Sequence, residues 1–179
     1  TAPLPPTVSF HSGTTMYTTV TVTLASGATT WEYSINSGSS WTAGSGQYLM
    51  LSEGTYAINA VQLRNSDAAG NTSTATTNTS SFTIDISAPS ISAITTDAFS
   101  WGAVLNTTED NINGTVTVTT LGVEYGRPLT ITLNDISYTS NISSNSTIVT
   151  IPAARLQGLT HGQSYTMIAN VSDAAGNAA

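Results

Sequence analysis

Apolar and polar residues alternate along many short segments of this chain, and clusters of Gly, Ser and Asn separate the segments. Alternation with a period of two predicts half-buried β-strands, because successive side chains of a strand point to opposite faces. No segment shows the 3.6-residue period of an amphipathic helix. The pattern therefore favours an all-β protein with strands at residues 18–24, 30–35, 47–51, 56–63, 80–84, 90–94, 103–105, 115–120, 129–133, 136–138, 147–151 and 164–171.

One helical turn is predicted at residues 152–159. Pro152 opens this segment, Gly158 falls near its end and Gly162 follows. Pro is favoured in the first turn of a helix and Gly just after the last. We expect this turn to cross from one sheet to another.

Two internal repeats indicate two domains. Ser-Asp-Ala-Ala-Gly-Asn occurs at residues 66–71 and again at 172–177, each time after a predicted strand. Ala-Pro occurs at residues 2–3 and 88–89, which lie 86 residues apart (88 minus 2). This spacing suits a small antiparallel β-sandwich. We predict two such sandwiches in tandem, residues 1–86 and 87–179, with the boundary at residues 85–89.

The second predicted domain is shorter after its repeat. The first continues from Asn71 through the strand at residues 80–84, whereas only Ala178 and Ala179 follow Asn177. We therefore expect the second sandwich to lack its final strand and to have an open edge. The chain does not begin with Met, and we expect it to be a piece of a longer polypeptide.

Composition narrows the function. The 179 residues include no Lys, ten Asp or Glu and no Cys, with a net charge of −7. An acidic surface repels phosphate groups, so we expect no nucleic-acid or membrane-surface partner. No apolar run reaches the roughly 18–20 residues of a membrane span, and the lack of Cys excludes disulfides and thiolate sites.

Catalysis is not expected from the titratable residues. The two histidines, His11 and His161, fall in different predicted domains, so neighbours in sequence form no triad or His-rich metal site. No Gly-rich loop leads into a helix, so a phosphate-binding loop is also missing. We expect a protein that is not an enzyme.

The repeated Asp loops are the strongest candidate for a site. In a seven-strand sandwich the loop after the sixth strand lies at the same pole as the N-terminus of the domain. Asp173 and Asn177 would then meet Asp85 of the linker, giving oxygen ligands of the type that Ca²⁺ prefers. Asp67 and Asn71 would lie at the corresponding pole of the first domain, as an incomplete site. The alternative is a simple turn, because Asp, Gly and Asn all favour turns.

Aromatic residues offer a second candidate. Trp31, Tyr33 and Trp41 belong to one predicted hairpin, with Trp31 and Tyr33 on the same face. If exposed, they would stack on a glycan or peptide; a buried Trp is instead a usual core residue of such sandwiches. Tyr56 and Tyr165 are expected to be tyrosine corners, whose hydroxyl groups bond upstream backbone.

Two further patterns have ordinary explanations. Thr recurs at every second position in residues 19–23 and 115–119. Two isolated strands do not make a repeated flat face, so we expect the polar side of half-buried strands rather than ice binding. Asn-X-Ser/Thr triplets, including those at Asn78 and Asn106, are expected by chance in a chain of which roughly a third is Ser and Thr.

Several strings resemble the tandem bacterial Ig-like domains of giant repetitive adhesins, the RTX adhesins exported by type I secretion. In the first half they are Trp-Glu-Tyr-Ser (31–34), Ser-Trp-Thr (40–42), Val-Gln-Leu-Arg (61–64), the repeat at 66–71 and Ile-Asp-Ile-Ser-Ala-Pro (84–89). In the second half Gly-Thr-Val-Thr-Val (114–118), Leu-Asn (133–134) and Thr-Ile-Pro-Ala-Ala (150–154) are similar to the same class.

The resemblance implies an immunoglobulin-like fold and a non-catalytic extender on the bacterial cell surface. In such repeats Ca²⁺ at domain junctions stiffens the string, with Asp85 and Asp173 at the expected ligand positions and Asp67 matching the loop position only. The implied partners are neighbouring domains of the adhesin, and the implied role is to project a ligand-binding region for adhesion or biofilm formation. The alternative is a glycan- or protein-binding module that uses Trp31, Tyr33 and Trp41.

Overall fold

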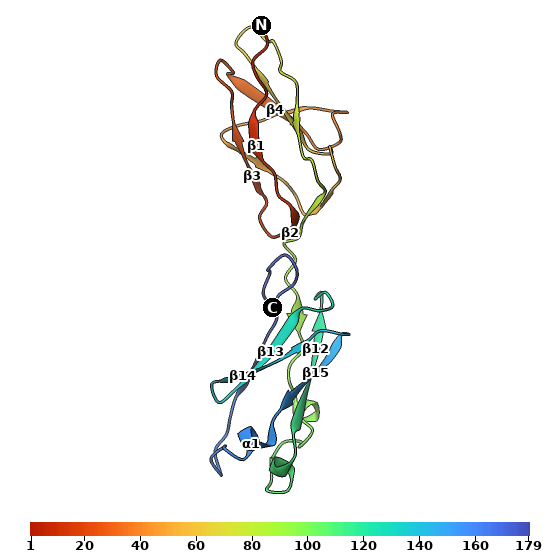
Figure 1. The fold of residues 1–179 in the computed structure, drawn as a ribbon, viewed down its shortest axis with the longest axis vertical. Helices are drawn as coiled ribbons and strands as arrows, with labels where there is room; N and C mark the ends of the chain where they lie inside the picture. The colour runs from red at the N-terminus through yellow and green to blue at the C-terminus, as the bar shows by residue number, and fades with distance from the viewer. The chain divides into compact units, whose positions relative to one another are not determined.

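The computed structural model describes every residue from Thr1 to Ala179. The chain divides into two compact units, Thr1–Ile86 (unit 1) and Ser87–Ala179 (unit 2). Each unit is built almost entirely of short strands around its own hydrophobic core (Figure 1). The prediction of an all-β protein is confirmed. None of the helices is long and apolar enough to cross a membrane.

Unit 1 contains three small sheets. Their strand orders are β1-β3-β6, β5-β4-β8-β9 and β2-β10-β7. β2 and β10 pair in parallel, whereas the other strand pairs of this unit are antiparallel. The strands are β1 (Thr7–Ser9), β2 (Gly13–Thr15), β3 (Thr19–Thr23), β4 (Thr30–Ser34), β5 (Thr42–Ala43), β6 (Tyr48–Met50), β7 (Gly54–Tyr56), β8 (Gln62–Ser66), β9 (Thr76–Thr77) and β10 (Phe82–Ile84).

Unit 2 contains two sheets, ordered β11-β12-β15 and β14-β13-β16, with every pair antiparallel. The strands are β11 (Ser90–Ile91), β12 (Gly114–Leu121), β13 (Pro128–Leu133), β14 (Ile136–Asn141), β15 (Ser146–Ile151) and β16 (Met167–Asn170). Two 3₁₀ turns, η1 (Thr96–Ala98) and η2 (Glu109–Asn111), precede β12. The one-turn helix α1 (Ala153–Leu156) follows Pro152, as predicted.

Alternation along the strands builds both cores. In β3 the three Thr side chains are exposed, whereas Val20 and Val22 are buried against residues of the facing sheet such as Trp31 and Leu63. In unit 2, Val116 and Val118 of β12 share a core with Leu129 and Ile131 of β13 in the same way. The regularly spaced Thr residues are thus the polar side of half-buried strands.

Two predicted strands were wrong. The segment predicted at residues 56–63 is split between β7 and β8, because Asn59 adopts φ +63° and Ala60 N–H donates to Ala57 O in a turn. The strand predicted at 103–105 is a loop that follows a turn closed by the Gly102 N–H on Phe99 O. Gly102 has a φ of +71°, and β-strands require a negative φ.

The two units differ after their Asp loops. In unit 1 the chain returns through β9, which pairs with β8, and through β10, which pairs with β7 and β2. In unit 2 the returning segment reaches only the bridge between Ser172 and Ala178. β16 therefore stands at the edge of the β14-β13-β16 sheet among residues 1–179.

Candidate functional site

The first Asp loop is closed by its own carboxylate. Asp67 Oδ1 accepts hydrogen bonds from the backbone N–H groups of Ala69 and Asn71, each at 2.9 Å. Asp67 Oδ2 accepts from the side-chain amide of Asn71, also at 2.9 Å. The backbone N–H of Asp67 donates in return to Asn71 O at 3.1 Å. Asp and Asn therefore pair directly at the two ends of the turn.

The second loop repeats this arrangement. Asp173 Oδ1 accepts from the backbone N–H groups of Gly176 and Asn177 at 2.8 Å, and Oδ2 accepts from the Asn177 amide at 2.9 Å. Asp173 N–H again donates to Asn177 O at 3.1 Å. Identical sequence thus produces the same Asp–Asn pair twice, and the predicted turn geometry is present in both copies.

The two carboxylates differ in their surroundings. The Asn71 side-chain amide is the main cause that holds the pKa of Asp67 below its ordinary value of 3.8, followed by the Asn71 backbone N–H. The Ala69 N–H and the positive charge of the N-terminus lower it slightly further. Asp67 is partly exposed, whereas Asp173 is only 1% exposed and Asn177 7%.

The Asp67 loop lies beside the N-terminal segment of unit 1. The amide of Asn65, on the strand that enters the loop, donates to Leu4 O at 3.0 Å. Asp67 itself lines a shallow hollow of about 350 Å³ together with Thr1, Ala2, Pro3, Leu4, Ser26 and Gly27. The loop after β8 and the first residues of the unit therefore meet, as the fold argument predicted.

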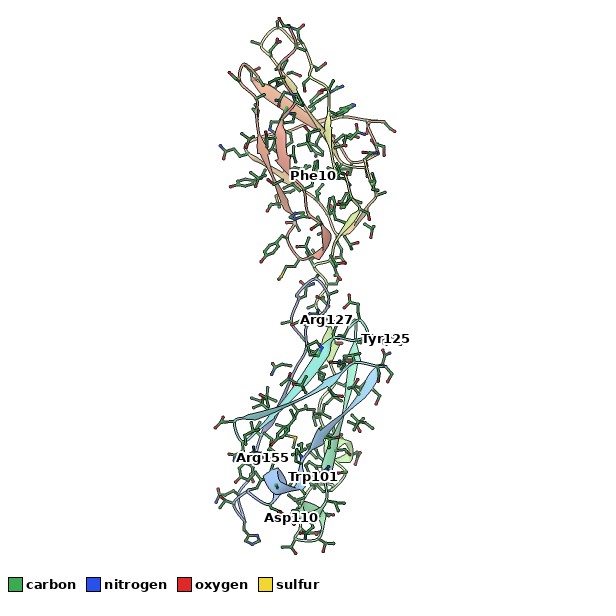
Figure 2. The ribbon with its side chains drawn as sticks, viewed as in Figure 1. Phe10, Trp101, Asp110, Tyr125, Arg127 and Arg155 are labelled. Carbon is green, nitrogen blue, oxygen red and sulfur yellow. The ribbon has the colours of Figure 1, made fainter.

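The Asp173 loop lies in the same place in unit 2. The connection between β12 and β13 contacts both segments: Gly122 approaches Pro89, and Glu124 Oε2 accepts from Ala174 N–H at 2.8 Å. Arg127 of the same connection donates from Nε to Ser172 O at 3.2 Å. Figure 2 shows Arg127 and Tyr125 at one end of unit 2, with Trp101 and Asp110 at the other.

Sequence reasoning missed three residues that hold these loops: Asn65, Glu124 and Arg127. Asn65 is fully buried, and Glu124 and Arg127 anchor a loop that follows them by about fifty residues. The signal in the sequence was weak, because none of the three belongs to a repeat. The contacts of Glu124 and Arg127 depend on tertiary pairing of β13 with β16, and that of Asn65 on the N-terminal segment of unit 1.

The side-chain oxygen atoms of Asp173 and Asn177 are suitable ligands for a hard cation. Asp173 is a buried carboxylate whose three hydrogen-bond donors are all neutral, and a buried carboxylate is otherwise usually balanced by a positive group. Asp and Asn supply oxygen, the ligand atom that Ca²⁺ prefers. The structure contains no cluster of three or more His, Asp or Glu residues that would hold a metal alone. Backbone carbonyls or water would have to complete the coordination.

Asp85, the predicted linker ligand, lies at the end of unit 1. Its backbone N–H donates to Thr15 O at 2.9 Å, which extends the pairing of β10 with β2 by one residue. Its side chain is partly exposed. The backbone position of Asp85 is therefore set by a strand rather than by a loop.

The aromatic hairpin is not an exposed platform, which corrects the alternative prediction. Trp31 is 3% exposed, lies in the core of unit 1 and donates from Nε1 to Gly46 O at 3.1 Å. Tyr33 packs partly against the same core. Trp41 carries the Arg64 guanidinium 4.0 Å from its ring centroid, and Arg64 also forms a 2.8 Å ion pair with Glu32.

The two tyrosines predicted as corners make the expected type of contact. Tyr56 donates its hydroxyl to Ser52 O at 3.0 Å, and Tyr165 accepts at its hydroxyl from Thr160 N–H at 2.8 Å. The histidines lie apart in sequence and environment: His11 contacts the ring of Phe82, and His161 is exposed in unit 2.

Comparison with known proteins gives matches among solved structures alone. No family model matches the chain, and no curated protein matches it. One similar structure is a 1.5-MDa bacterial ice-binding adhesin, described for its retention on the host cell surface; the identity is 24%, the TM-score 0.41, and the match covers 100% of this chain and 62% of that one.

A second similar structure is a Ca²⁺-stabilized adhesin with which an Antarctic bacterium binds ice. The identity is 24%, the TM-score 0.37, and the match covers 90% of this chain and 40% of that one. The chain thus spans less than two thirds of each. Both structural neighbours are bacterial ice-binding adhesins.

Proposed function

We propose that this chain is a non-catalytic extender segment of a bacterial cell-surface adhesin, stiffened by Ca²⁺ at the junction of its two units. In this role the units are bacterial Ig-like domains that project a ligand-binding region away from the cell for adhesion or biofilm formation. The protein would lie outside the cell, and its partners would be neighbouring domains of the same adhesin and the surface ligand of that region.

The repeated Asp loop carries the proposal. A turn needs no buried carboxylate, because Asn or Ser also caps such turns. Yet Asp173 keeps a carboxylate that is 1% exposed and has neutral donors alone. Since each loop lies at the N-terminal end of its own unit, a domain that precedes such a unit in a string would place its last residues beside this carboxylate.

Asp85 is the linker residue in that position. We assign Asp85, Asp173 and Asn177 as ligands at the junction, with Asp67 and Asn71 as the corresponding pair of unit 1. Bound Ca²⁺ would place a positive charge between two approaching carboxylates, which repel each other as like charges when no cation is bound. The side chains would then hold the linker to the loop and restrict motion between the units.

Calcium titration tests the proposal on the full chain. Small-angle X-ray scattering and thermal melts are recorded in millimolar Ca²⁺ and in EDTA. We expect Ca²⁺ to raise the melting temperature and to narrow the distribution of particle shapes. Asp173→Asn and Asp85→Asn should each abolish both effects, because each removes a charged ligand.

Asp135→Asn is the matched control. It removes the same charge from unit 2 but lies in the turn between β13 and β14, where φ +60° suits Asn equally well. This variant should respond to Ca²⁺ as the parent does. Scattering and melting that do not change with Ca²⁺ in the parent would leave the Asp loops as turns only and overturn the calcium site.

A further inference from the structure

β2 and β10 are the parallel strand pair of unit 1, and they join the first part of its chain to the last. The register pairs Thr15 with Ile84, and the Asp85 N–H extends it by donating to Thr15 O at 2.9 Å. The N-terminal segment that begins at Thr1 leads into β2, and unit 1 ends at Ile86, two residues after β10. A force that pulls the two ends of unit 1 apart therefore reaches this pair from both sides.

The direction of the two strands decides how such a force acts on them. Because β2 and β10 are parallel, the end at which the chain enters β2 and the end at which it leaves β10 lie at opposite ends of the pair. Figure 1 shows the N-terminus at one end of unit 1 and β2 at the other. Tension along the unit thus slides the two strands past each other, and the hydrogen bonds between them must break together rather than one at a time.

The contacts made before β2 do not hold the two ends of the unit together. β1 pairs with β3, the Asn65 amide of β8 donates to Leu4 O at 3.0 Å, and the Thr76 hydroxyl of β9 donates to Pro6 O at 2.6 Å. The partner strands β3, β8 and β9 all lie between β2 and β10 in the chain. Loss of these contacts therefore passes the load on to β2 and leaves β10 in place.

Buried side chains fix the position of β10 along its partners. Phe82 and Ile84 of β10 are 2% and 0% exposed. Phe82 stacks on Tyr56 of β7 with ring centroids 5.2 Å apart, and His11, just before β2, meets the Phe82 ring edge-on at 5.8 Å. A slip of one residue would turn both apolar side chains of β10 toward the opposite face of the sheet. Burial of these side chains therefore opposes the sliding that tension would cause.

We propose that the β2–β10 pair is the tension-bearing clamp of unit 1, which fails in shear and sets the force at which the unit unfolds. The use of this clamp in a cell-surface string rests on the proposed extender function, whereas the clamp itself is a property of unit 1. Forced unfolding depends on the barrier to unfolding rather than on the free energy of unfolding. The mechanical and the thermodynamic stability of unit 1 should therefore respond to different residues.

Pulling β10 in two directions with optical tweezers tests the clamp. The chain has no Cys, so handles can be attached to the full chain through Thr1→Cys with Ile86→Cys, or through Glu53→Cys with Ile86→Cys. Glu53 precedes Gly54, which pairs with Ile84, so the second attachment pulls β7 and β10 apart from adjacent ends. We expect the second attachment to open at about half the force of the first or less, because its hydrogen bonds break in turn. Measurement in EDTA excludes any effect of Ca²⁺, so the clamp and the calcium site are tested separately.

Two variants separate the clamp from the core. Thr15 O accepts from the Asp85 N–H, and the N–H of a strand residue points to the same side as its C=O, so Thr15→Pro removes a donor that faces β10. This variant should lower the force for the attachment at residues 1 and 86 toward that for residues 53 and 86. Leu49→Ala is the control, because Leu49 is 2% exposed in the core and belongs to β6. It should lower the urea midpoint and leave the unfolding force nearly unchanged.

Three results would overturn the proposal. Equal forces for the two attachments would show that the direction of pull does not matter. An unchanged force in folded Thr15→Pro would show that the β2–β10 pair is not the barrier. A force lowered as much by Leu49→Ala as by Thr15→Pro would make the core, and not the clamp, the limit. If Thr15→Pro does not fold, the comparison of the two attachments decides.

Discussion

The side-chain amide of Asn177 donates to Asp173 Oδ2 at 2.9 Å, and Asn71 makes the same 2.9 Å bond to Asp67 in the other unit. The two pairs differ in burial, since Asp173 and Asn177 are nearly inaccessible and the residues of the first loop are not. The same hydrogen bonds should therefore contribute differently to the stability of the two units, because an unsatisfied buried group costs more than an exposed one.

Asp173→Ala should destabilise unit 2 by about 1–3 kcal/mol, the usual cost of buried donors left without an acceptor. The substitution removes the acceptor of the Gly176 and Asn177 backbone N–H groups and of the Asn177 amide. Urea unfolding in EDTA measures this loss without any contribution from bound metal. Asp67→Ala should cause a smaller loss, because water can replace the carboxylate there; equal losses would contradict this explanation.

Asp67 should titrate below the ordinary Asp value of 3.8. Since its pKa is lower in the folded than in the unfolded chain, the ionised carboxylate stabilises unit 1 above the unfolded value. That contribution is lost as pH falls through the folded value. Side-chain ¹³C chemical shifts between pH 2 and pH 6 measure the titration. Asn71→Ala should raise the pKa toward the ordinary value, and an unchanged titration would mean that the Asn71 amide is not the main cause.

Regular alternation made the long strands predictable. In β3 and in the middle of β12 Val alternates with Thr, and burial of the Val residues against a facing sheet is enough to select strand. The short strands β1, β2, β5 and β9 contain two or three residues and have no local pattern. β2 exists because it pairs with β10, which lies nearly seventy residues later in the chain.

The candidate site was predictable only in part. The repeated sequence indicated the turn and the Asp–Asn pair, which are local and were found in both units. The aromatic hairpin could not be interpreted from spacing, because alternation places Trp31 and Tyr33 on one face without showing which face is buried. Burial of Trp31 depends on β4 pairing with β8 and on the loop that ends at Gly46.

The buried Trp31 indole leaves no space for a side chain at position 44, which is Gly. Its N–H donates to Trp31 O at 2.8 Å, and a Cβ at this position would overlap the Trp31 ring. Gly44→Ala should therefore displace the ring and destabilise unit 1 by roughly 1–3 kcal/mol, the usual cost of overpacking. Near-UV circular dichroism and urea unfolding measure both effects. Gly158→Ala is the control, because a Cβ there meets its nearest atoms at an ordinary 3.5 Å; equal effects of the two substitutions would contradict the prediction.

Asn78 joins three segments of unit 1 although its side chain is fully buried. Oδ1 accepts from Val61 N–H at 2.9 Å, and Nδ2 donates to Ala57 O and Ser80 O, each at 2.8 Å. These bonds hold the turn that splits β7 from β8 against the segment leading to β10. The Asn-X-Ser/Thr triplet at Asn78 is thus explained by structure, since both polar atoms of the amide are used inside the protein.

Asn78→Leu should destabilise unit 1 by about 2–4 kcal/mol, because it leaves one backbone donor and two backbone acceptors buried without partners. Native-state hydrogen exchange should show the loss first at Val61 N–H, which depends on the Asn78 side chain. Asn106→Leu is the matched control: Asn106 is exposed and holds a local turn through the Thr108 and Glu109 N–H groups. This control should leave exchange at Val61 unchanged. The prediction is contradicted if the Val61 N–H already exchanges rapidly in the parent chain. It is also contradicted if this N–H stays as well protected in Asn78→Leu as in the parent chain.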